Sequence, residues 1–355
     1  PCVVGLATPV ALAAGLNKAA RNHILIRDTS ALEQMRNVDV VVFDKTGTLT
    51  EGHPTVIGWL WAQGQEEHYK DVLLAAESTS DHPLAEAIVT ALEGEEQVIP
   101  AHLDGFENIT GKGVRVAYQG AEYWVGSHKL LKDYQANLSD ILADMLTQYE
   151  SDGNSIVYFG RENDLLAVIA IKDQLRVTSM EAIRELRTQD IEICMLTGDG
   201  ERTASSVAGS LGIMRFMADA MPDDKEDFIH KLQLQGKTVA MVGDGVNDAQ
   251  ALSCADVSIA MGKGTDTLMD TAMITLRTSD LLLLPKVFRL SRQTVSLMYR
   301  NLFWAFIYNT VGIFVAAGVL YPVYDILLSP ALAGAAMALS CVSVALSSLR
   351  LSSRF

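Results

Sequence analysis

Short apolar runs that end in polar turns recur along the central part of this 355-residue chain. Three of them, at 39–43, 191–196 and 238–243, are rich in Val, Ile, Met or Leu, and each leads into a turn that contains Gly and Asp. Runs of this length and composition predict buried strands. Stretches with helical periodicity, such as 179–186, lie between them, so the alternation predicts a parallel sheet with helices on its faces.

The turns that follow these strands carry candidate chemistry. Asp44 begins the string Asp-Lys-Thr-Gly-Thr-Leu-Thr, Thr-Gly-Asp occupies 197–199, and Asp-Gly-Val-Asn-Asp occupies 244–248. Carboxyl ends of parallel strands meet at one edge of a sheet, and carboxylates gathered there favour a hard cation such as Mg²⁺. A solvated Asp at a strand end is the simpler interpretation of any single turn. Together they indicate a site in which Asp44 attacks a phosphorus atom.

An interruption of the strand–helix rhythm follows the first of these strands. It extends from residue 52 to residue 168 and predicts a second domain inserted into the first. Within it, Pro83 is suited to the first turn of a helix that starts after His82. Gly111 and Gly113 form a Gly-x-Gly, which by itself is more often a simple turn than a binding loop.

Two uncharged stretches near the carboxyl end, at 301–321 and 326–349, are each long enough to cross a bilayer. Lys and Arg flank the pair on both outer sides, which predicts that both flanks are cytoplasmic. The chain opens with Pro1-Cys2 and an apolar run, without Met. We therefore expect it to be the carboxyl-terminal part of a longer protein and to begin inside a membrane helix.

Composition excludes some classes of function. The net charge of -15 argues against nucleic-acid binding, which needs a basic surface. The four cysteines include no Cys-x-x-Cys pair, so a disulfide framework is not expected and a reducing compartment fits the central part.

These motifs together resemble those of the P-type ATPases, which are built on the haloacid-dehalogenase fold. The resemblance implies that ATP phosphorylates Asp44, and that Mg²⁺ is held by Asp44, Asp244 and the backbone carbonyl of Thr46. The catalytic residues that it implies are Asp44, Lys45, Thr46, Thr197, Gly198, Asp199, Lys225, Asn247 and Asp248. Related phosphatases carry an acid/base Asp at the position of Thr46, so the aspartyl phosphate is expected to persist here.

The expected fold class is α/β: a haloacid-dehalogenase-like parallel-sheet phosphorylation domain with an inserted α+β nucleotide-binding domain, plus transmembrane α-helices. The expected division gives 1–25 to the end of a membrane helix and its cytoplasmic extension, 26–51 and 169–280 to the two parts of the phosphorylation domain, 52–168 to the nucleotide-binding domain, and 281–355 to two transmembrane helices.

The heavy-metal branch of these pumps supplies a further match in the inserted domain. Its nucleotide-binding domain carries a His-Pro pair, a Glu five residues earlier and a Gly-x-Gly, which correspond to Glu77, His82, Gly111 and Gly113. The resemblance implies that these four residues bind ATP. The family usually has an Asn where this chain has Ser127, so Ser127 is not counted among them.

Polar and sulfur-containing residues of the apolar stretches resemble the ion site of the copper-transporting subgroup. The residues that match are Cys2, Tyr308, Asn309, Met337 and Ser340. Sulfur ligands suit a soft ion such as Cu(I), although simple packing roles are open for each residue. Phe314 and Cys341 depart from the subgroup's pattern, which usually has Pro and Ser there.

The resemblance implies an enzyme that exports Cu(I) through an aspartyl-phosphate intermediate. The same pump class with Ag⁺, Zn²⁺ or Cd²⁺ as cargo is the nearest alternative, and a phosphatase of the same fold is a more distant one. Its expected partners are ATP, Mg²⁺, membrane lipid and a cytoplasmic copper chaperone, with no nucleic acid. Its expected location is the bacterial inner (plasma) membrane, with the catalytic domains in the cytoplasm.

Overall fold

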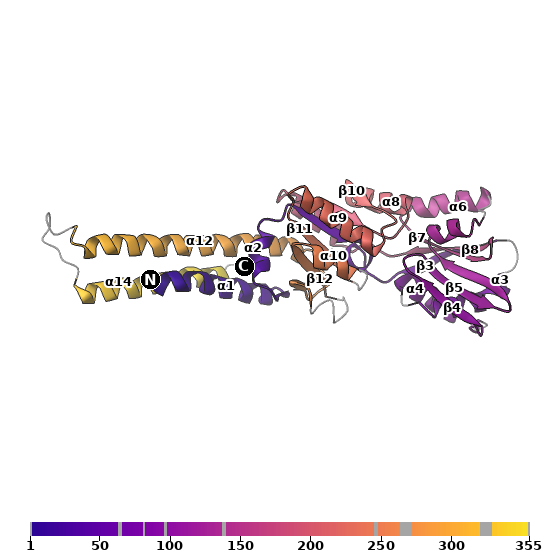
Figure 1. Cartoon of the computed structure of the whole chain (residues 1–355), viewed down its shortest axis with the longest axis horizontal. Helices are drawn as coiled ribbons and strands as arrows, with labels where there is room; N and C mark the ends of the chain where they lie inside the picture. Colours follow the sequence, from indigo (N-terminus) through magenta and orange to yellow (C-terminus); the bar gives the residue numbers. More distant parts are fainter. Residues whose placement is uncertain are drawn as a thin grey trace.

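The structure, a computed structural model, describes residues 2–62, 66–80, 82–95, 98–136, 140–244, 248–262, 271–319 and 329–353. Three parts follow one another along the long axis of the molecule: a helical part, a seven-stranded domain and a six-stranded domain (Figure 1). The six-stranded domain is an insertion, because the chain leaves the seven-stranded domain after its strand β2 and returns to it before β9.

The seven-stranded domain is built on a sheet whose strands pair in parallel, except for its first strand at one edge. In spatial order they are β1 (Ile24–Ile26), β13 (Ile274–Leu276), β12 (Val257–Met261), β11 (Val239–Gly243), β2 (Val40–Asp44), β9 (Glu192–Leu196) and β10 (Arg215–Met217). The three strands predicted from the apolar runs, β2, β9 and β11, are neighbours. The predicted α/β class with a parallel sheet is confirmed.

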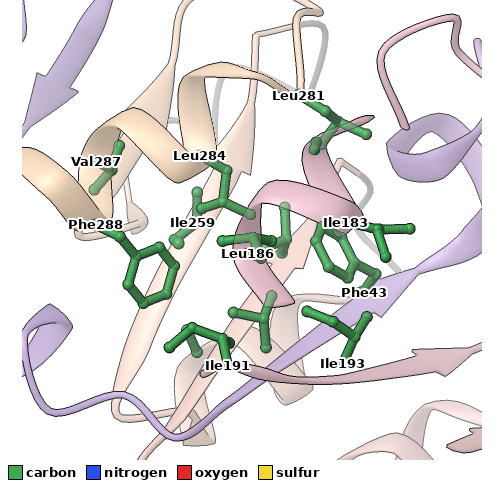
Figure 2. Packing of buried hydrophobic residues seen from close by; sticks show 14 of the residues in the cluster. Phe43, Ile183, Leu186, Ile191, Ile193, Ile259, Leu281, Leu284, Val287 and Phe288 are labelled. Carbon is green, nitrogen blue, oxygen red and sulfur yellow. The ribbon is translucent and has the colours of Figure 1, made fainter. Parts of the chain in front are cut away.

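Burial on both faces of this sheet explains why its strands are apolar throughout. Successive side chains point to opposite faces, so Val41 and Phe43 join one hydrophobic cluster, and Val40 and Val42 join the other. Helices α2 (Ser30–Met35), α7 (Ser179–Arg187) and α8 (Glu201–Leu211) pack on the first face, and α9 (Pro222–Leu234) and α10 (Ala249–Cys254) on the second. Figure 2 shows Phe43 among residues of α7 and of the helix that begins at Leu283.

The six-stranded domain contains an antiparallel sheet with helices on both faces. Its strands, in spatial order, are β3 (Thr55–Trp61), β8 (Asp164–Lys172), β7 (Ser155–Arg161), β6 (Ala121–Gly126), β5 (Gly113–Tyr118) and β4 (Gly105–Ile109). Helices α3 (Glu66–Glu77) and α4 (Pro83–Glu93) pack on one face, and α5 (His128–Asp133) and α6 (Asp140–Ser151) on the other.

One predicted boundary differs from the structure. We placed the return to the first domain at residue 169, because an apolar run reappears there. The structure shows residues 169–172 as the end of β8, paired with β3 and β7 in the six-stranded sheet. The apolar run is buried within the inserted domain, and Asp173 is the first residue beyond it.

Among the described residues, the helical part consists of α1 (Cys2–Arg21), α12 (Leu283–Ala316) and α14 (Pro330–Ser353). They lie side by side, and α12 also reaches the seven-stranded domain, where Leu284, Val287 and Phe288 enter its core (Figures 1 and 2). Further along α12, large apolar side chains such as Phe306 and Phe314 are exposed. The helix therefore joins a buried core to an exposed apolar surface.

Among the described residues, one helical segment, Ala331–Leu349, has the length and apolar character needed to cross a membrane, with a mean hydropathy of 1.9. It lies within the predicted stretch 326–349, of which 326–328 fall outside the described residues. Within the described part of the predicted stretch 301–321, which reaches residue 319, α12 ends at Ala316. Gly318 has a φ of +84°, and the amide of Val319 donates to the carbonyl of Phe314, which is a helix-ending motif.

Candidate active site

The carboxyl ends of β2, β9 and β11 bring three of the predicted turns together. Asp44 lies beside Leu196 in the register of β2 and β9, so Thr197 follows directly alongside it. On the other side Phe43 lies beside Val242, which places Asp244 close to the Asp44 end of β2. Asp44 and Thr197 are both buried, and Asp244 is half-buried.

The turn after Asp44, labelled η1 (Lys45–Leu49), has a left-handed backbone at one position, which favours glycine. Thr46 has φ and ψ of -74° and 130°, and Gly47 has 71° and -15°, which are the values of a type II turn. A Cβ on Gly47 would also lie 1.5 Å from Oδ2 of Asp244. Glycine at this position therefore gives the turn its shape and leaves room for the Asp244 carboxylate.

Residues that the sequence analysis did not select hold this turn in place. The Thr50 hydroxyl lies 2.5 Å from Oδ2 of Asp173, and the amide of Gly52 donates to Oδ1 of Asp173 at 3.1 Å. Arg176 donates to the backbone carbonyls of Gly47 and Thr48. Asp173 follows an apolar strand, as Asp44 does, and that shared position is the signal that could have identified it.

Two lysines neutralise the buried carboxylates. Nζ of Lys225 lies 2.5 Å from Oδ1 of Asp44 and 2.7 Å from Oδ1 of Asp248. Burial alone would lower the pKa of Lys225, but these two carboxylates outweigh it and raise that pKa. Lys45 forms an ion pair with Asp199 and donates to the hydroxyl of Ser155 at 3.1 Å. Ser155 begins β7, so this second contact joins the two domains.

Asp199 stays ionised because of its partners. Its burial would raise its pKa, but the charge of Lys45 and several hydrogen bonds lower it overall. The hydroxyl of Thr197 donates to Oδ2 of Asp199 at 2.8 Å, so it points at Asp199 in this structure. Among the described residues, a Cβ on Gly198 would lie 3.8 Å from the carbonyl oxygen of Ala220, which is an ordinary contact distance.

Three carboxylates at this edge suit a hard divalent cation. Carboxylate oxygens of Asp44, Asp244 and Asp248 lie within 4.8 Å of one another. Burial, with the charge of Asp44 as the next cause, raises the pKa of Asp244 to about 7 and also raises that of Asp248. A bound cation would favour the ionised forms of Asp244 and Asp248 and so lower both pKa values again. Oxygen donors are the ligands that Mg²⁺ prefers. The residues present therefore fit Mg²⁺, with Thr46 half-buried beside them and Asn247 outside the described residues.

The predicted nucleotide residues Glu77 and His82 lie on the six-stranded domain. Glu77 ends α3 and is buried, and this burial raises its pKa to about 8, so the carboxyl is neutral at pH 7. His82 precedes α4, and its Nδ1 accepts a hydrogen bond from the amide of Leu84 at 3.2 Å. Desolvation lowers the pKa of His82, and the charges of Asp199, Lys45 and Asp44 also act on it. The His82 side chain thus caps helix α4.

The two glycines Gly111 and Gly113 have different surroundings. Gly111 has a φ of +67°, and a Cβ there would lie 2.6 Å from Sδ of Met221 in the seven-stranded domain. Gly113 has a φ of +144°, and its Cβ would lie 2.1 Å from the carbonyl oxygen of Val125. The close approach at Gly113 is therefore to strand β6, whereas Gly111 lies where the two domains meet.

The residues predicted to bind a transported ion are spread over the helical part. Tyr308 and Met337 are exposed, Ser340 is buried, and Nδ2 of Asn309 donates to the carbonyl of Ala305 within α12. Cys2 begins α1, but its side chain is outside the described residues. Cys341 packs near Ala305 and Val344. The described contacts do not join these side chains into one site.

Comparison with known proteins places this arrangement in a family. The family model for haloacid dehalogenase-like hydrolases matches residues 38–256, which include β2, β9, β11 and the whole six-stranded insertion. The chain belongs to the haloacid dehalogenase-like family. The match contains Asp44, Thr197, Asp199, Lys225, Asp244 and Asp248.

Relatives of this chain match it over nearly its whole length, including the helical part outside residues 38–256. It is 42% identical over 351 residues to the copper-exporting P-type ATPase of Legionella pneumophila, and 44% identical over 356 residues to the silver exporting P-type ATPase of Salmonella typhimurium. Both matches cover 99% of this chain but only 47% and 43% of the relatives. The chain spans about half the length of these relatives. The identification with the heavy-metal P-type ATPases is confirmed at the level of sequence family.

Solved structures extend the likeness to three dimensions. A zinc-transporting PIB-type ATPase in the E2.Pi state matches with a TM-score of 0.69 and 35% identity, over 99% of this chain and 56% of that one. The catalytic domain of the CPx-ATPase CopB-B matches with a TM-score of 0.63 and 28% identity, over 76% of this chain and 96% of that one. The second match corresponds to a catalytic domain alone, so the haloacid dehalogenase-like part has this likeness by itself.

Proposed function

We propose that this chain is the catalytic and carboxyl-terminal membrane part of an ATP-driven pump that exports Cu(I) through an aspartyl phosphate on Asp44. The observation that carries the proposal is the buried arrangement of Asp44, Lys225 and Asp248 beside Asp244 at the edge of a parallel sheet. Phosphoryl transfer needs mainly positioning and charge neutralisation, and this group supplies both.

In the proposed reaction a carboxylate oxygen of Asp44 forms a bond to the γ-phosphorus of ATP. The bond between that phosphorus and the β–γ bridging oxygen breaks, and ADP leaves with the electron pair. Lys225 lies 2.5 Å from Asp44 and is placed to balance the charge on the transferred group. Mg²⁺, when bound at Asp44, Asp244 and Thr46, supplies Lewis-acid polarisation of the phosphate.

Thr46 favours a long-lived phosphoenzyme over a phosphatase cycle. Its side chain cannot act as the carboxylic acid/base that would activate water or protonate a leaving group. The aspartyl phosphate therefore persists long enough to be coupled to movement of the helices. Thr197 is placed alongside Asp44 and would bind a phosphoryl oxygen after its hydroxyl turns from Asp199.

The nucleotide is proposed to bind on the six-stranded domain at Glu77, His82, Gly111 and Gly113. The charges of the Asp44 region already act on His82, which supports a nucleotide lying between the two domains. Lys129 donates to the carbonyl of Asp219 at 2.6 Å, and Arg202 lies 3.1 Å from Glu150, so direct contacts also join the two domains.

For the cargo, Cu(I) is proposed because the sulfur atoms of Cys2 and Met337 are ligands that suit a soft ion. Relatives named as copper exporters also match 99% of the chain. Ag⁺ is the second candidate, since a relative named as a silver exporter matches as well. The proposed location is the bacterial inner (plasma) membrane with the two sheet domains in the cytoplasm, where a copper chaperone would deliver the ion.

The first test is acid-stable labelling of the full-length protein with γ-labelled ATP. The second is its ATP turnover in membranes, measured under reducing conditions with Cu(I), Ag⁺, Zn²⁺ or Cd²⁺ added. We expect labelling of the wild type, none in Asp44→Asn, and stimulated turnover with Cu(I). Labelling of Asp44→Asn equal to wild type would remove Asp44 as the nucleophile. Stimulation by Zn²⁺ or Cd²⁺ alone would be consistent with phosphorylation of Asp44 but would contradict Cu(I) as the cargo.

A further inference from the structure

A second group of possible metal ligands lies on the seven-stranded domain, apart from the carboxylates around Asp44. Glu226 and His230 are on α9, and Cys254 ends the neighbouring helix α10. One carboxylate oxygen, one imidazole nitrogen and the thiol sulfur lie within 4.8 Å of one another. Glu226 and His230 are four residues apart, so they share one face of the helix.

Gln233 fixes how the imidazole of His230 is turned. Its Nε2 donates to the carbonyl of Cys254 at 2.9 Å and lies 3.3 Å from Oδ2 of Asp256. Both of these partners are acceptors, so the amide group of Gln233 must face them and its Oε1 must face His230. That Oε1 lies 3.1 Å from Nδ1 of His230. Nδ1 therefore donates its proton to Gln233.

This orientation leaves Nε2 of His230 facing Glu226, at 3.4 Å from its Oε1. Metal-binding histidines are commonly held in this way, with one ring nitrogen donating to a carbonyl oxygen and the other turned to the ion. Gln233 also contacts the backbone of Cys254, so one side chain positions two of the three possible ligands. An ordinary surface His–Glu pair four residues apart needs no such support.

We propose that Glu226, His230 and Cys254 bind a divalent ion of the Zn²⁺ type, with water in the fourth position. Zinc takes thiolate, imidazole and carboxylate ligands in tetrahedral sites. Its bond lengths place ligand atoms roughly 3.3–3.8 Å apart, which small side-chain rotations can reach here. Cu(I) favours sulfur-rich sites and Mg²⁺ favours oxygen alone, so this mixed set favours Zn²⁺ over both.

The position of this site links it to the Asp44 region. Glu226 follows Lys225 in the chain, and Cys254 ends the short helix that starts after Asp248. Nζ of Lys225 lies 2.7 Å from Oδ1 of Asp248. Lys225 also pairs with Asp44, so both residues belong to the candidate active site. An ion bound by α9 and α10 would hold these two helices together and fix that contact. Binding of the ion does not depend on the proposed pump function, whereas its effect on phosphorylation rests on it.

The test is Zn²⁺ binding to the full chain by calorimetry, with Mg²⁺ in excess and no ATP. Co²⁺ serves as a second probe, because a thiolate ligand gives it a near-ultraviolet charge-transfer absorption. We expect one Zn²⁺ per chain at this site. Cys254→Ser and His230→Ala each remove a direct ligand, so they should lower the affinity by more than the roughly 10–100-fold that loss of an outer-shell partner costs. Both changes should also remove the cobalt–thiolate absorption or alter it. Gln233→Ala, which keeps all three ligands, should weaken binding roughly tenfold.

Matched controls distinguish this site from others on the chain. His102 is an exposed histidine on the six-stranded domain, so His102→Ala should leave Zn²⁺ binding unchanged. Cys341 lies in the helical part. If Cys341→Ser abolished binding while Cys254→Ser did not, the ion would be held among the helices and the proposal would be overturned. Failure of the wild type to bind Zn²⁺ or Co²⁺ would also overturn it. Because the assay contains no ATP, either outcome is independent of whether Asp44 is phosphorylated.

Discussion

Glu77 is a buried carboxyl on the face of the inserted domain that we assign to the nucleotide. Burial raises its pKa to about 8, so it carries a proton at pH 7 and can donate a hydrogen bond. We expect ATP affinity to fall roughly tenfold as the pH rises through about 8, because the ionised carboxylate loses that donor and repels the phosphates. In Glu77→Gln the amide keeps a donor at every pH, so its ATP affinity should stay level across the same range.

The raised pKa of Glu77 also makes the stability of the fold depend on pH. The direction of this dependence is opposite to the one that a salt-bridged carboxylate gives. Between its ordinary value of 4.5 and about 8, the folded chain holds a proton on Glu77 that the unfolded chain has released. The free energy of unfolding should therefore fall as the pH rises through this window. Thermal unfolding of the wild type and of Glu77→Gln measures the difference. An unchanged slope in the variant would contradict the assignment.

Asp244 makes metal binding depend on pH. Its pKa is raised to about 7 by burial and by the charge of Asp44, so below that pH a divalent cation must displace a proton. We expect the apparent Mg²⁺ affinity for phosphorylation of Asp44 to rise roughly tenfold per pH unit up to about 7 and then to level off. Mg²⁺ titrations of ATP labelling at several pH values measure this. An affinity that is flat from about pH 5.5 to pH 7 would be the contrary result.

At the level of single residues, the sequence predicted those whose chemistry a motif displays. Asp44, Lys225 and Asp248 could be placed together because each follows or precedes a recognisable element. Arg176 and Ser155 could not, because they hold other groups through contacts across more than 100 residues of chain. Asp173 has a similar long-range role, and only its position after an apolar strand could have pointed to it. The rotation of Thr197 toward Asp199 likewise depends on a hydrogen bond that no pattern displays.

The turn after β2 is the element on which the site depends most. In Gly47→Ala a Cβ would meet the Asp244 carboxylate at 1.5 Å, and the positive φ would add strain of order 1–2 kcal/mol. We expect loss of phosphorylation by at least about 100-fold, with most of the thermal stability retained. Labelling with ATP, together with thermal unfolding, measures both effects.

Gly209 provides the matched control for that change. It lies on the exposed side of α8, and no described residue outside its own helical turn lies within 4 Å of the position of its Cβ. Gly209→Ala should keep full phosphorylation and gain up to about 1 kcal/mol from better helix propensity. If both alanine variants behaved alike, the special role of the turn would be disproved.

Helices and strands with a strong hydrophobic pattern were predicted well. The residues at which they end, and the sheet that a strand joins, were predicted less well. The buried strands β2, β9 and β11 were recognisable because helices cover both faces of their sheet. Strand β8 is equally apolar, but an apolar run does not reveal which sheet it joins, so residues 169–172 were given to the wrong domain. The end of α12 depends on the backbone of Gly318, which sequence hydropathy does not describe.

Across the whole molecule, α12 is a continuous connection through which the two ends can influence each other. Figure 1 shows α12 running from the seven-stranded domain along the helical part. Its first turns are buried in the core under the Asp44 sheet, and its far end carries exposed aromatic side chains. Midway, Met298 packs with Leu297 against Ala11 of α1. Asn301 donates to the hydroxyl of Ser348 on α14 at 3.1 Å. A continuous helix of 34 residues, about 50 Å long, can therefore transmit movement between these regions as a rigid rod.

A kink in α12 should uncouple phosphorylation of Asp44 from ion-stimulated turnover. Met298→Pro removes a backbone donor in the middle of α12 and kinks it, at a local cost of about 3 kcal/mol. In the full-length protein we expect ATP to label Asp44 still, because the sheet domains keep their contacts, while ion-stimulated turnover falls by at least about tenfold. Met298→Ala removes the same side chain but keeps the helix straight, so it should retain most of the stimulation. If Met298→Pro kept the stimulation, movement would have to pass through α1 instead; if it lost the labelling as well, α12 would be needed for the fold of the site itself.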